Sequence, residues 1–450
     1  MSHRETESEA RTGVKTQLTP AILTAMQQEL TVLQQSTAQY PVALKFSAAE
    51  LDPWQWLNAN ADQTRVAWSD RSSDEIIAGV GDAAAVEQSP GGDFSQCVGR
   101  CRELLQGNSD LRFFGGLSFD GTAAWKQFGA GRFVIPRLQL SGGQLTLAVM
   151  DADDVDRARL ELQRICFESN PLPEKLPQPV SRSYSPTYDG WHSRIDEALS
   201  LIRSEALEKI VLSRTAKLKF DQPLNPIALS QRLKATTHDC FVFCFDFGAE
   251  SAFVGATPER LFLRRGDELQ SEVVAGTRMR GDNSIEDEGL AIELLTSDKD
   301  QREHDIVRKS IRQKLHQFID HLQVDSQASI LRLARKQHLR SNVRGNLKAN
   351  VDDGMLLKRL HPTPAVGGYP TENALPEIAR IEPFNRGWYS APIGWIDADS
   401  AQFAVAIRSG LVEGDTLSLF SGAGIVRGSD PDQEWQEVEN KIQDFMSVLK

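Results

Sequence analysis

Two pairs of acidic residues have the spacing that a divalent metal ion requires. Asp300 and Glu303 lie in DKDQREHD, and Glu434 and Glu437 lie in DPDQEWQEVENK, both within segments of helical pattern. Residues three positions apart share one face of a helix. Two such faces across a cleft would repel unless a cation lay between them, and Mg²⁺ prefers one or two carboxylates with water and substrate oxygens. The pairs indicate either a Mg²⁺ site or, more simply, solvated helix charge.

A lysine and a glutamate have the chemistry of a base and an acid. The alternation of KIVLSRTAKL puts Lys209 on the strand face opposite Ile210 and Leu212. Lys209 then either extends to solvent or lines a polar cleft, where a lowered pKa would make it a general base. Glu259 follows a turn at the end of the apolar strand in GATPERL. It is either solvated or a candidate acid.

Arginines and glycines form a third group. Arg214 and Arg408 each lie within a strand of apolar residues, and a buried guanidinium needs a carboxylate partner from the protein or from a ligand. Because Arg214 lies on the face opposite Lys209, we expect it to form a structural ion pair. Gly422 and Gly424 lie at the end of another strand, where their backbone N–H groups could approach an anion closely.

The segments around these residues predict helices and antiparallel strands. Helical patterns occupy residues 19–35 and 153–168, and a helix with one apolar face from Trp191 to Ile202 precedes the Lys209 strand. Between residues 40 and 147, strand-like runs alternate with Gly and Asp turns. The charged segment from about Ile285 to Leu322 predicts one long helix.

Strands joined by turns more often than by helices favour an α+β fold with antiparallel sheets. We expect residues 1–18 to form a disordered tail and residues 19–168 the N-terminal half of this fold. Five prolines between Pro171 and Pro186 predict a linker at 169–187. Residues 188–450 then contain the candidate catalytic groups.

The composition excludes several classes of partner. A formal net charge of −12 is poorly suited to nucleic acid or anionic lipid. No run of about 18 apolar residues is present to span a bilayer. The polar N-terminus has no signal-peptide pattern, so we expect a cytoplasmic protein. The five cysteines form no CxxC pair and are expected to be small buried side chains.

Taken together and in order, the motifs resemble the chorismate-binding enzymes. The motifs are EKIVLSR, GATPERLF, VVAGTRMRG, KDQREH, HPTPAVGG, RGWYSAPIGW, FAVAIRSG and SGAGIVRGSDPDQEWQEVENK, which span residues from about Lys209 to Lys441. The resemblance implies a single large α+β domain of two antiparallel sheets flanked by helices. It also implies a Mg²⁺-dependent site for chorismate in the cleft.

Three residue types separate the members of this family. Lys209 resembles the members that use water, whereas the members that use ammonia typically have glutamine there. Ala275 stands where aminodeoxychorismate synthases have a nucleophilic lysine. Ala365 stands where members that also eliminate pyruvate usually have threonine. The resemblance therefore implies isochorismate synthase activity, an isomerisation that adds water at C2 of chorismate as the C4 hydroxyl leaves.

The resemblance also implies roles for individual residues. Lys209 would be the general base and Glu259 the general acid, with Glu303 and Glu437 as Mg²⁺ ligands and Asp300 and Glu434 in contact with the metal through water. The substrate-binding residues would be Gly276, Thr277, His361, Ala365, Tyr389, Arg408, Gly422, Gly424 and Lys441. Asn385, Ser390 and Ala391 depart from the commonest family pattern, which puts fine positioning in doubt.

Several alternatives stay open at the level of the sequence. A salicylate synthase shares the lysine and the acid, and an anthranilate synthase chain is disfavoured by Lys209. A catalytically inactive chorismate sensor would be expected to have lost some of these groups, and a glycoside hydrolase would not need Lys209. We expect a monomer without an amidotransferase subunit. The product would serve a quinone, siderophore or salicylate pathway.

Overall fold

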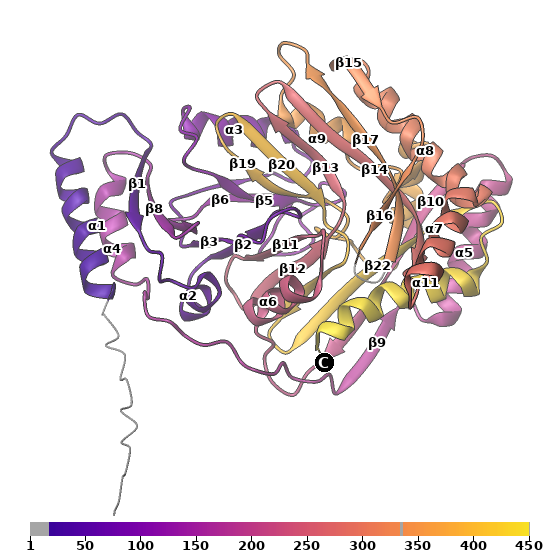
Figure 1. Cartoon of the computed structure of the whole chain (residues 1–450), viewed down its shortest axis with the longest axis horizontal. Helices are drawn as coiled ribbons and strands as arrows, with labels where there is room; N and C mark the ends of the chain where they lie inside the picture. Colours follow the sequence, from indigo (N-terminus) through magenta and orange to yellow (C-terminus); the bar gives the residue numbers. More distant parts are fainter. Residues whose placement is uncertain (1–17, 334–335, 450) are drawn as a thin grey trace, which may run out of the picture.

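Strands from both halves of the chain form two large antiparallel sheets in the computed structural model (Figure 1). The structure describes residues 18–333 and 336–449, so the tail expected at 1–18 lies, apart from Leu18, outside the described residues. The predicted α+β class is confirmed, because every strand pairing described is antiparallel and helices flank the sheets.

The first sheet has the order β1 (Val42–Ser47), β8 (Gln144–Val149), β7 (Leu138–Ser141), β3 (Ile77–Val80), β2 (Arg65–Ser69), β11 (Phe241–Asp246), β12 (Ser251–Thr257), β21 (Ser409–Glu413), β22 (Thr416–Val426), β10 (Lys209–Lys219) and β18 (Gly368–Tyr369), with β9 (Ser181–Ser185) also paired to β10. The second has the order β15 (Ile319–Val324), β17 (Lys336–Leu347), β14 (Glu268–Met279), β13 (Arg260–Arg265), β20 (Ser400–Val405), β19 (Pro392–Ile396), β5 (Phe113–Leu117), β6 (Gly131–Ile135) and β4 (Ala84–Glu87), with β16 (Ser329–Arg332) also paired to β17.

The described helices are α1 (Leu18–Gln34), α2 (Pro53–Ala59), α3 (Phe94–Leu105), α4 (Asp154–Leu162), α5 (Tyr188–Arg203), α6 (Pro226–Thr236), α7 (Ser284–Thr296), α8 (Asp298–Leu315), α9 (Asp353–Leu360), α10 (Thr371–Ile381) and α11 (Pro431–Met446), followed by a short 3₁₀ helix, η1 (Ser447–Leu449). Helices α1 and α4 lie at one end of the molecule, and α5, α7, α8 and α11 lie at the other (Figure 1).

Aromatic side chains from both sheets form one buried cluster between them. Phe241 and Phe245 share a face of β11 because side chains alternate along a strand. Phe241 packs against Trp68 of β2 at a ring separation of 5.8 Å. The cluster continues to Tyr389 and Phe420, whose rings stack 5.3 Å apart. Large rings bury much apolar area, so this cluster fixes the two sheets against each other.

The N-terminal and C-terminal halves share both sheets. Strand β2 pairs with β11 in the first sheet, and β5 pairs with β19 in the second. The proline-rich segment between the halves is irregular at first, and its last residues form β9, which pairs with β10. The connection therefore ends inside the first sheet, beside the strand that begins with Lys209.

The prediction of one long helix from Ile285 to Leu322 is wrong. The segment forms α7 and α8, separated at Ser297, and then β15. The Ser297 hydroxyl accepts a hydrogen bond from the backbone N–H of Asp300 at 3.3 Å and so caps α8. The helix predicted at 153–168 is also shorter than expected and ends at Leu162.

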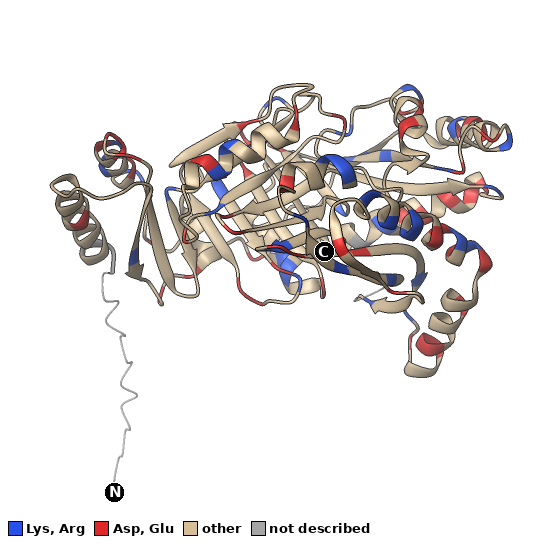
Figure 2. Cartoon of the chain, turned by 90° about the horizontal axis from the view of Figure 1, so that it is seen from above, with Lys and Arg blue, Asp and Glu red and all other residues tan. Residues whose placement is uncertain are grey.

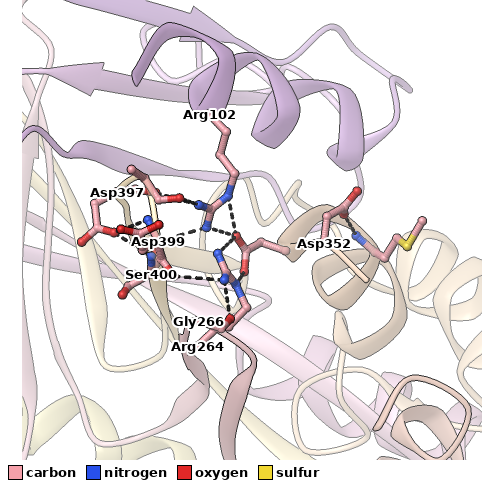
Figure 3. Close-up of polar contacts among 10 residues, drawn as sticks. Arg102, Arg264, Gly266, Asp352, Asp397, Asp399 and Ser400 are labelled. Atoms are coloured by element: carbon pink, nitrogen blue, oxygen red, sulfur yellow. Dashed lines mark hydrogen bonds and ion pairs between the residues drawn. The ribbon is translucent and has the colours of Figure 1, made fainter. Parts of the chain in front are cut away.

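A buried group of charges joins the two halves, and we call it the Asp353 cluster (Asp353, Arg102 and Arg264). Figure 3 labels its two arginines. The carboxylate of Asp353 in the first turn of α9 is fully buried. It accepts hydrogen bonds from Arg102 of α3 and from Arg264 of β13, the latter at 2.5 and 3.0 Å. Arg102 also donates to the carbonyl of Asp397 at 2.9 Å. The cluster thus holds α3, α9 and the β19–β20 turn together.

The remaining charges lie mainly over the helices. Basic and acidic segments are interspersed there, most densely at the end opposite the N-terminal helices (Figure 2).

Within 18–333 and 336–449, no helix has both the length and the apolar character needed to cross a bilayer. The expected burial of the cysteines is confirmed for Cys97, Cys101, Cys240 and Cys244, whereas Cys166 is partly exposed.

Candidate active site

A cavity of about 320 Å³ lies where β10, β14 and β22 meet α8 and α11. Most of the side chains that the sequence singled out line it together. These are Glu259, Gly276, Thr277, Asp300, Glu303, Ala365, Tyr389, Arg408, Gly422, Gly424, Glu437 and Lys441. Lys209, His361 and Glu434 are not among its lining residues. Ala275, one of the residues that separate family members, also lines the cavity.

Lys209 lies directly behind the cavity wall. Its side chain is fully buried, which excludes the solvent-exposed alternative, and its Nζ donates a hydrogen bond to Glu303 Oε1 at 2.8 Å. Gly424 of the neighbouring strand β22 makes this placement possible. A Cβ atom at that position would lie 2.8 Å from Lys209 Cε and 3.0 Å from Glu303 Oε1. Glycine is therefore required where the lysine and the glutamate approach each other.

Glu259 follows β12 and is buried at the cavity. Burial and the nearby charge of Glu272 together raise the pKa of Glu259 to about 8, against the opposing effect of Lys209 and Arg408. Glu272 itself is paired with Arg71, which donates to its two oxygens at 2.6 and 2.9 Å. Glu259 is therefore mainly protonated at neutral pH, the state that a general acid requires.

The two acidic pairs lie on two helices, α8 and α11, that both contribute to the cavity wall. Glu303 of α8 pairs with Lys209, and Glu437 of α11 accepts a hydrogen bond from Lys441 at 2.8 Å. Asp300 forms an ion pair with Arg278, also at 2.8 Å. Glu434 is buried behind the wall, and burial together with Glu437 raises its pKa. Each of the three helix carboxylates that line the cavity thus faces a basic side chain.

The residues at this wall fit a Mg²⁺ ion that takes substrate oxygens as ligands. Within the described parts of the chain, no three His, Cys, Asp or Glu residues form a metal-binding group by themselves. Glu303 and Glu437 nevertheless line one cavity from two helices. Mg²⁺ commonly takes one or two protein carboxylates and completes its shell with water and substrate. The donor set is therefore compatible with this ion.

Cationic and hydrogen-bonding groups occupy the rest of the wall. Lys441 Nζ donates to the carbonyl of Gly422 at 2.9 Å as well as to Glu437. Arg408 has a positive φ of 52° just beyond β20, and its guanidinium donates to His338 Nε2 at 2.8 Å. The phenol of Tyr389 lies close to Gly422. These groups are suited to holding carboxylates of a small anionic substrate.

His338 is a cavity residue that the sequence analysis missed. Its Nδ1 lies 3.2 Å from the carbonyl of Gly276 and 3.0 Å from the hydroxyl of Thr277. Burial lowers the pKa of His338 well below its usual value, so the ring is neutral. Because Arg408 donates to Nε2, the proton of the neutral ring resides on Nδ1. A single histidine in the strand KQHLRSNVRG carries no signal that distinguishes it from a core residue.

His361 is placed differently from the expectation. The sequence predicted that it would line the hydroxyl face of the substrate ring, but the structure puts its Nε2 3.0 Å from the carbonyl of Phe119, away from the cavity lining. Burial lowers its pKa to about 4. It ends α9 and precedes the loop that brings Ala365 to the cavity.

Arg214 forms the structural ion pair that its strand face predicted. Its guanidinium is fully buried and donates to Glu439 of α11 at 2.5 Å. The same group lies over the ring of Trp435, 3.5 Å from the centroid. Lys209 and Arg214 thus occupy opposite faces of β10, one toward the cavity and one toward α11.

The departures from the family pattern lie in two places. Asn385 donates to Asp120 at 2.9 Å and to Thr122 at 3.0 Å, outside the cavity lining. Ser390 lines the cavity and has a positive φ of 61°, and Ala391 is fully buried. Only Ser390 therefore belongs to the candidate site itself.

Comparison with known proteins agrees with this geometry. A family model described as "Chorismate binding enzyme" matches residues 25–450. The chain belongs to this family. It is 37% identical over 371 residues to isochorismate synthase 2, chloroplastic, of Arabidopsis thaliana, a match that covers 78% of this chain and 66% of that protein. It is 32% identical over 406 residues to isochorismate synthase MenF of Escherichia coli (strain K12), covering 89% and 91% of the two chains.

Solved structures of the family extend the likeness to the whole fold. The structure of MenF, the menaquinone-specific isochorismate synthase from Escherichia coli, superposes with a TM-score of 0.84 at 30% identity over 95% of this chain and 100% of that chain. Anthranilate synthase component I from Streptococcus pneumoniae, at 21% identity and a TM-score of 0.66, shares the fold. The resemblance to the chorismate-binding enzymes found in the sequence is confirmed.

Proposed function

We propose that this protein is an isochorismate synthase, which converts chorismate to isochorismate. The observation that carries the proposal is a buried lysine and a protonated glutamate at one cavity, with alanine at both positions 275 and 365. The names of the plant and bacterial relatives support the same activity.

The reaction exchanges the position of one hydroxyl group. Water attacks C2 of the ring, the double bonds shift, and the C4 hydroxyl departs. Lys209 accepts a proton from the attacking water, and Glu259 donates a proton to the departing hydroxyl, which leaves as water. One water enters and one leaves, so the product is an isomer of the substrate.

The remaining cavity groups bind and orient the dianionic substrate. Arg408 and Tyr389 hold the enolpyruvyl carboxylate, and Lys441 with the backbone of Gly422 holds the ring carboxylate. Glu303 and Glu437 would hold Mg²⁺, which when bound would offset the negative charge of the substrate and fix its ring carboxylate. Because these charges are fixed in a cavity that is screened from water, they hold the ring in position without further rearrangement.

Finer features of the proposal follow from the sequence. We expect the enzyme to act in the cytoplasm as a monomer without an amidotransferase subunit, and to supply isochorismate to a quinone or siderophore pathway. Proteins similar to this chain include the menaquinone-specific isochorismate synthase MenF of Escherichia coli and the isochorismate synthase DhbC of Bacillus subtilis. Size-exclusion chromatography with light scattering tests the monomer directly.

A product assay tests the activity. The purified chain is incubated with chorismate and Mg²⁺, and the products are separated by chromatography while free pyruvate is measured with a coupled dehydrogenase. We expect isochorismate without pyruvate or salicylate. Release of pyruvate together with salicylate would make the protein a salicylate synthase, and unchanged chorismate would favour a non-catalytic sensor.

A further inference from the structure

A second, smaller cavity of about 130 Å³ adjoins the active site beneath the end of α11. Arg408 and Lys441 line both cavities, so these two side chains form the partition between them. The outer walls come from the end of α6, the start of β11 and η1. No role in the proposed reaction requires this side cavity, which we define by Leu233, Ala256, Arg408, Lys441, Phe445 and Val448.

The charges of the side cavity are all of one sign. Lys336 lines it together with Arg408 and Lys441, whereas no Asp or Glu is among the described residues that line it. This is unusual in a chain with a formal net charge of −12. Arg408 donates to the neutral ring of His338, and no carboxylate of the described residues lies within ion-pair distance of it. Its positive charge is therefore available to an anion.

The opposite wall of the side cavity is apolar. Leu233 of α6, Phe445 of α11 and Val448 of η1 are all buried and line it. A ligand that matches both walls has a negative group at one end and an apolar body at the other. The volume accommodates a single six-membered ring.

We propose that this side cavity binds a small aromatic carboxylate, with its carboxylate toward Arg408 and Lys441 and its ring against Leu233, Phe445 and Val448. We expect a ligand in the side cavity to regulate the enzyme as well. This part of the proposal rests on the proposed function, in which the same two cations hold the carboxylates of chorismate. A ligand that draws them toward the side cavity then weakens substrate binding without entering the substrate cavity.

Isothermal titration of the full-length protein with benzoate tests the site without substrate. We expect benzoate to bind, and the uncharged benzamide and the cationic benzylamine not to bind. Val448→Phe fills the cavity and should weaken benzoate binding about tenfold, whereas Val448→Ala enlarges it and should retain binding. Leu233→Phe fills it from the opposite helix, and thermal unfolding verifies that each variant is folded.

Kinetics with chorismate then test the link to the active site. Benzoate should raise the KM of the unmodified enzyme, and Val448→Phe should keep its kinetics with chorismate while losing this sensitivity. No binding of benzoate, or equal binding to folded Val448→Phe and Leu233→Phe, would overturn the proposal. A protein that binds benzoate in this way but forms no isochorismate would instead refute the proposed function alone.

Discussion

The Asp353 cluster and the active-site cavity both bury a carboxyl group and raise its pKa, yet they surround it with different partners. Asp353 receives hydrogen bonds from two guanidinium groups; burial raises its pKa, and the charge and hydrogen bonds of Arg264 oppose that rise. Glu259 has no basic nitrogen of the described residues within ion-pair distance, and Glu272 adds a like charge, so its pKa reaches about 8. Burial alone therefore does not determine the role of a carboxyl group. The partners decide whether it stabilises the fold or carries a proton.

The same contrast occurs along β10. Arg214 pairs with Glu439 and lies over the ring of Trp435, away from the cavity. Lys209 is paired with Glu303, a side chain that also lines the cavity. The charge on one face of β10 therefore serves the packing of α11, and the charge on the other face lies at the candidate site.

The largest effect is expected from removing divalent metal. EDTA should abolish turnover of chorismate and added Mg²⁺ should restore it, because Glu303 and Glu437 then lose the cation that offsets the substrate charge. The stability of the Asp353 cluster needs no metal, so circular dichroism in EDTA should be unchanged. Turnover that is indifferent to both additions would remove the metal role of the two glutamates.

Lys209→Ala should reduce kcat by roughly 10²- to 10⁴-fold, because no base remains to accept the proton of water. Steady-state kinetics measure the loss, and thermal unfolding checks that the fold persists. Lys219→Ala is the matched control, since Lys219 ends the same strand with an exposed side chain. Near-normal turnover of Lys209→Ala would assign the base to another group.

Glu259→Gln should reduce kcat by about 10²-fold or more and should also change the pH profile. Because the pKa of Glu259 is raised to about 8, the acid form dominates below that pH, and wild-type kcat/KM should fall as the pH rises through about 8. The residual activity of the variant should lack this alkaline decline. Glu268→Gln, at the exposed start of β14, serves as the control. A decline that persists in Glu259→Gln would mean that a different group titrates.

Asp353→Asn should lower the free energy of unfolding by about 3 kcal/mol, because two guanidinium groups lose their shared carboxylate. Urea denaturation measures this, while kcat of the folded variant should stay close to the wild-type value. Asp352→Asn is the matched control, because asparagine also caps a helix well. A loss of kcat without a loss of stability would contradict the structural role of the cluster.

Arg214→Met should have the smallest effect, about 1–2 kcal/mol in the free energy of unfolding. Glu439 keeps its second partner, Arg182, at 2.7 Å, so no isolated charge is left behind. Turnover of chorismate should be unaffected, because Arg214 faces away from the cavity. A fall in kcat at unchanged stability would show that the two faces of β10 are coupled.

The sequence determined the strands, the order of the motifs and most of the cavity lining. Alternation predicted antiparallel sheet and placed Lys209 and Arg214 on opposite faces, because the side-chain period of a strand is a local property. The spacing of the acidic pairs predicted one helix face for each pair; Asp300, Glu303 and Glu437 line the cavity, whereas Glu434 lies behind its wall. The break at Ser297 was missed, since a capping serine inside a charged run does not interrupt the helical pattern.

Only the tertiary structure decided which of the candidate residues meet. Nothing local distinguishes His361, which lies against Phe119, from His338, which reaches Arg408 in the cavity. The burial of Lys209 depends on Gly424, which is far away in sequence and leaves room for its side chain. Local patterns define faces and ends of elements, but the pKa of Glu259 and the pairing of Lys209 arise from groups that only the packing of two sheets brings together.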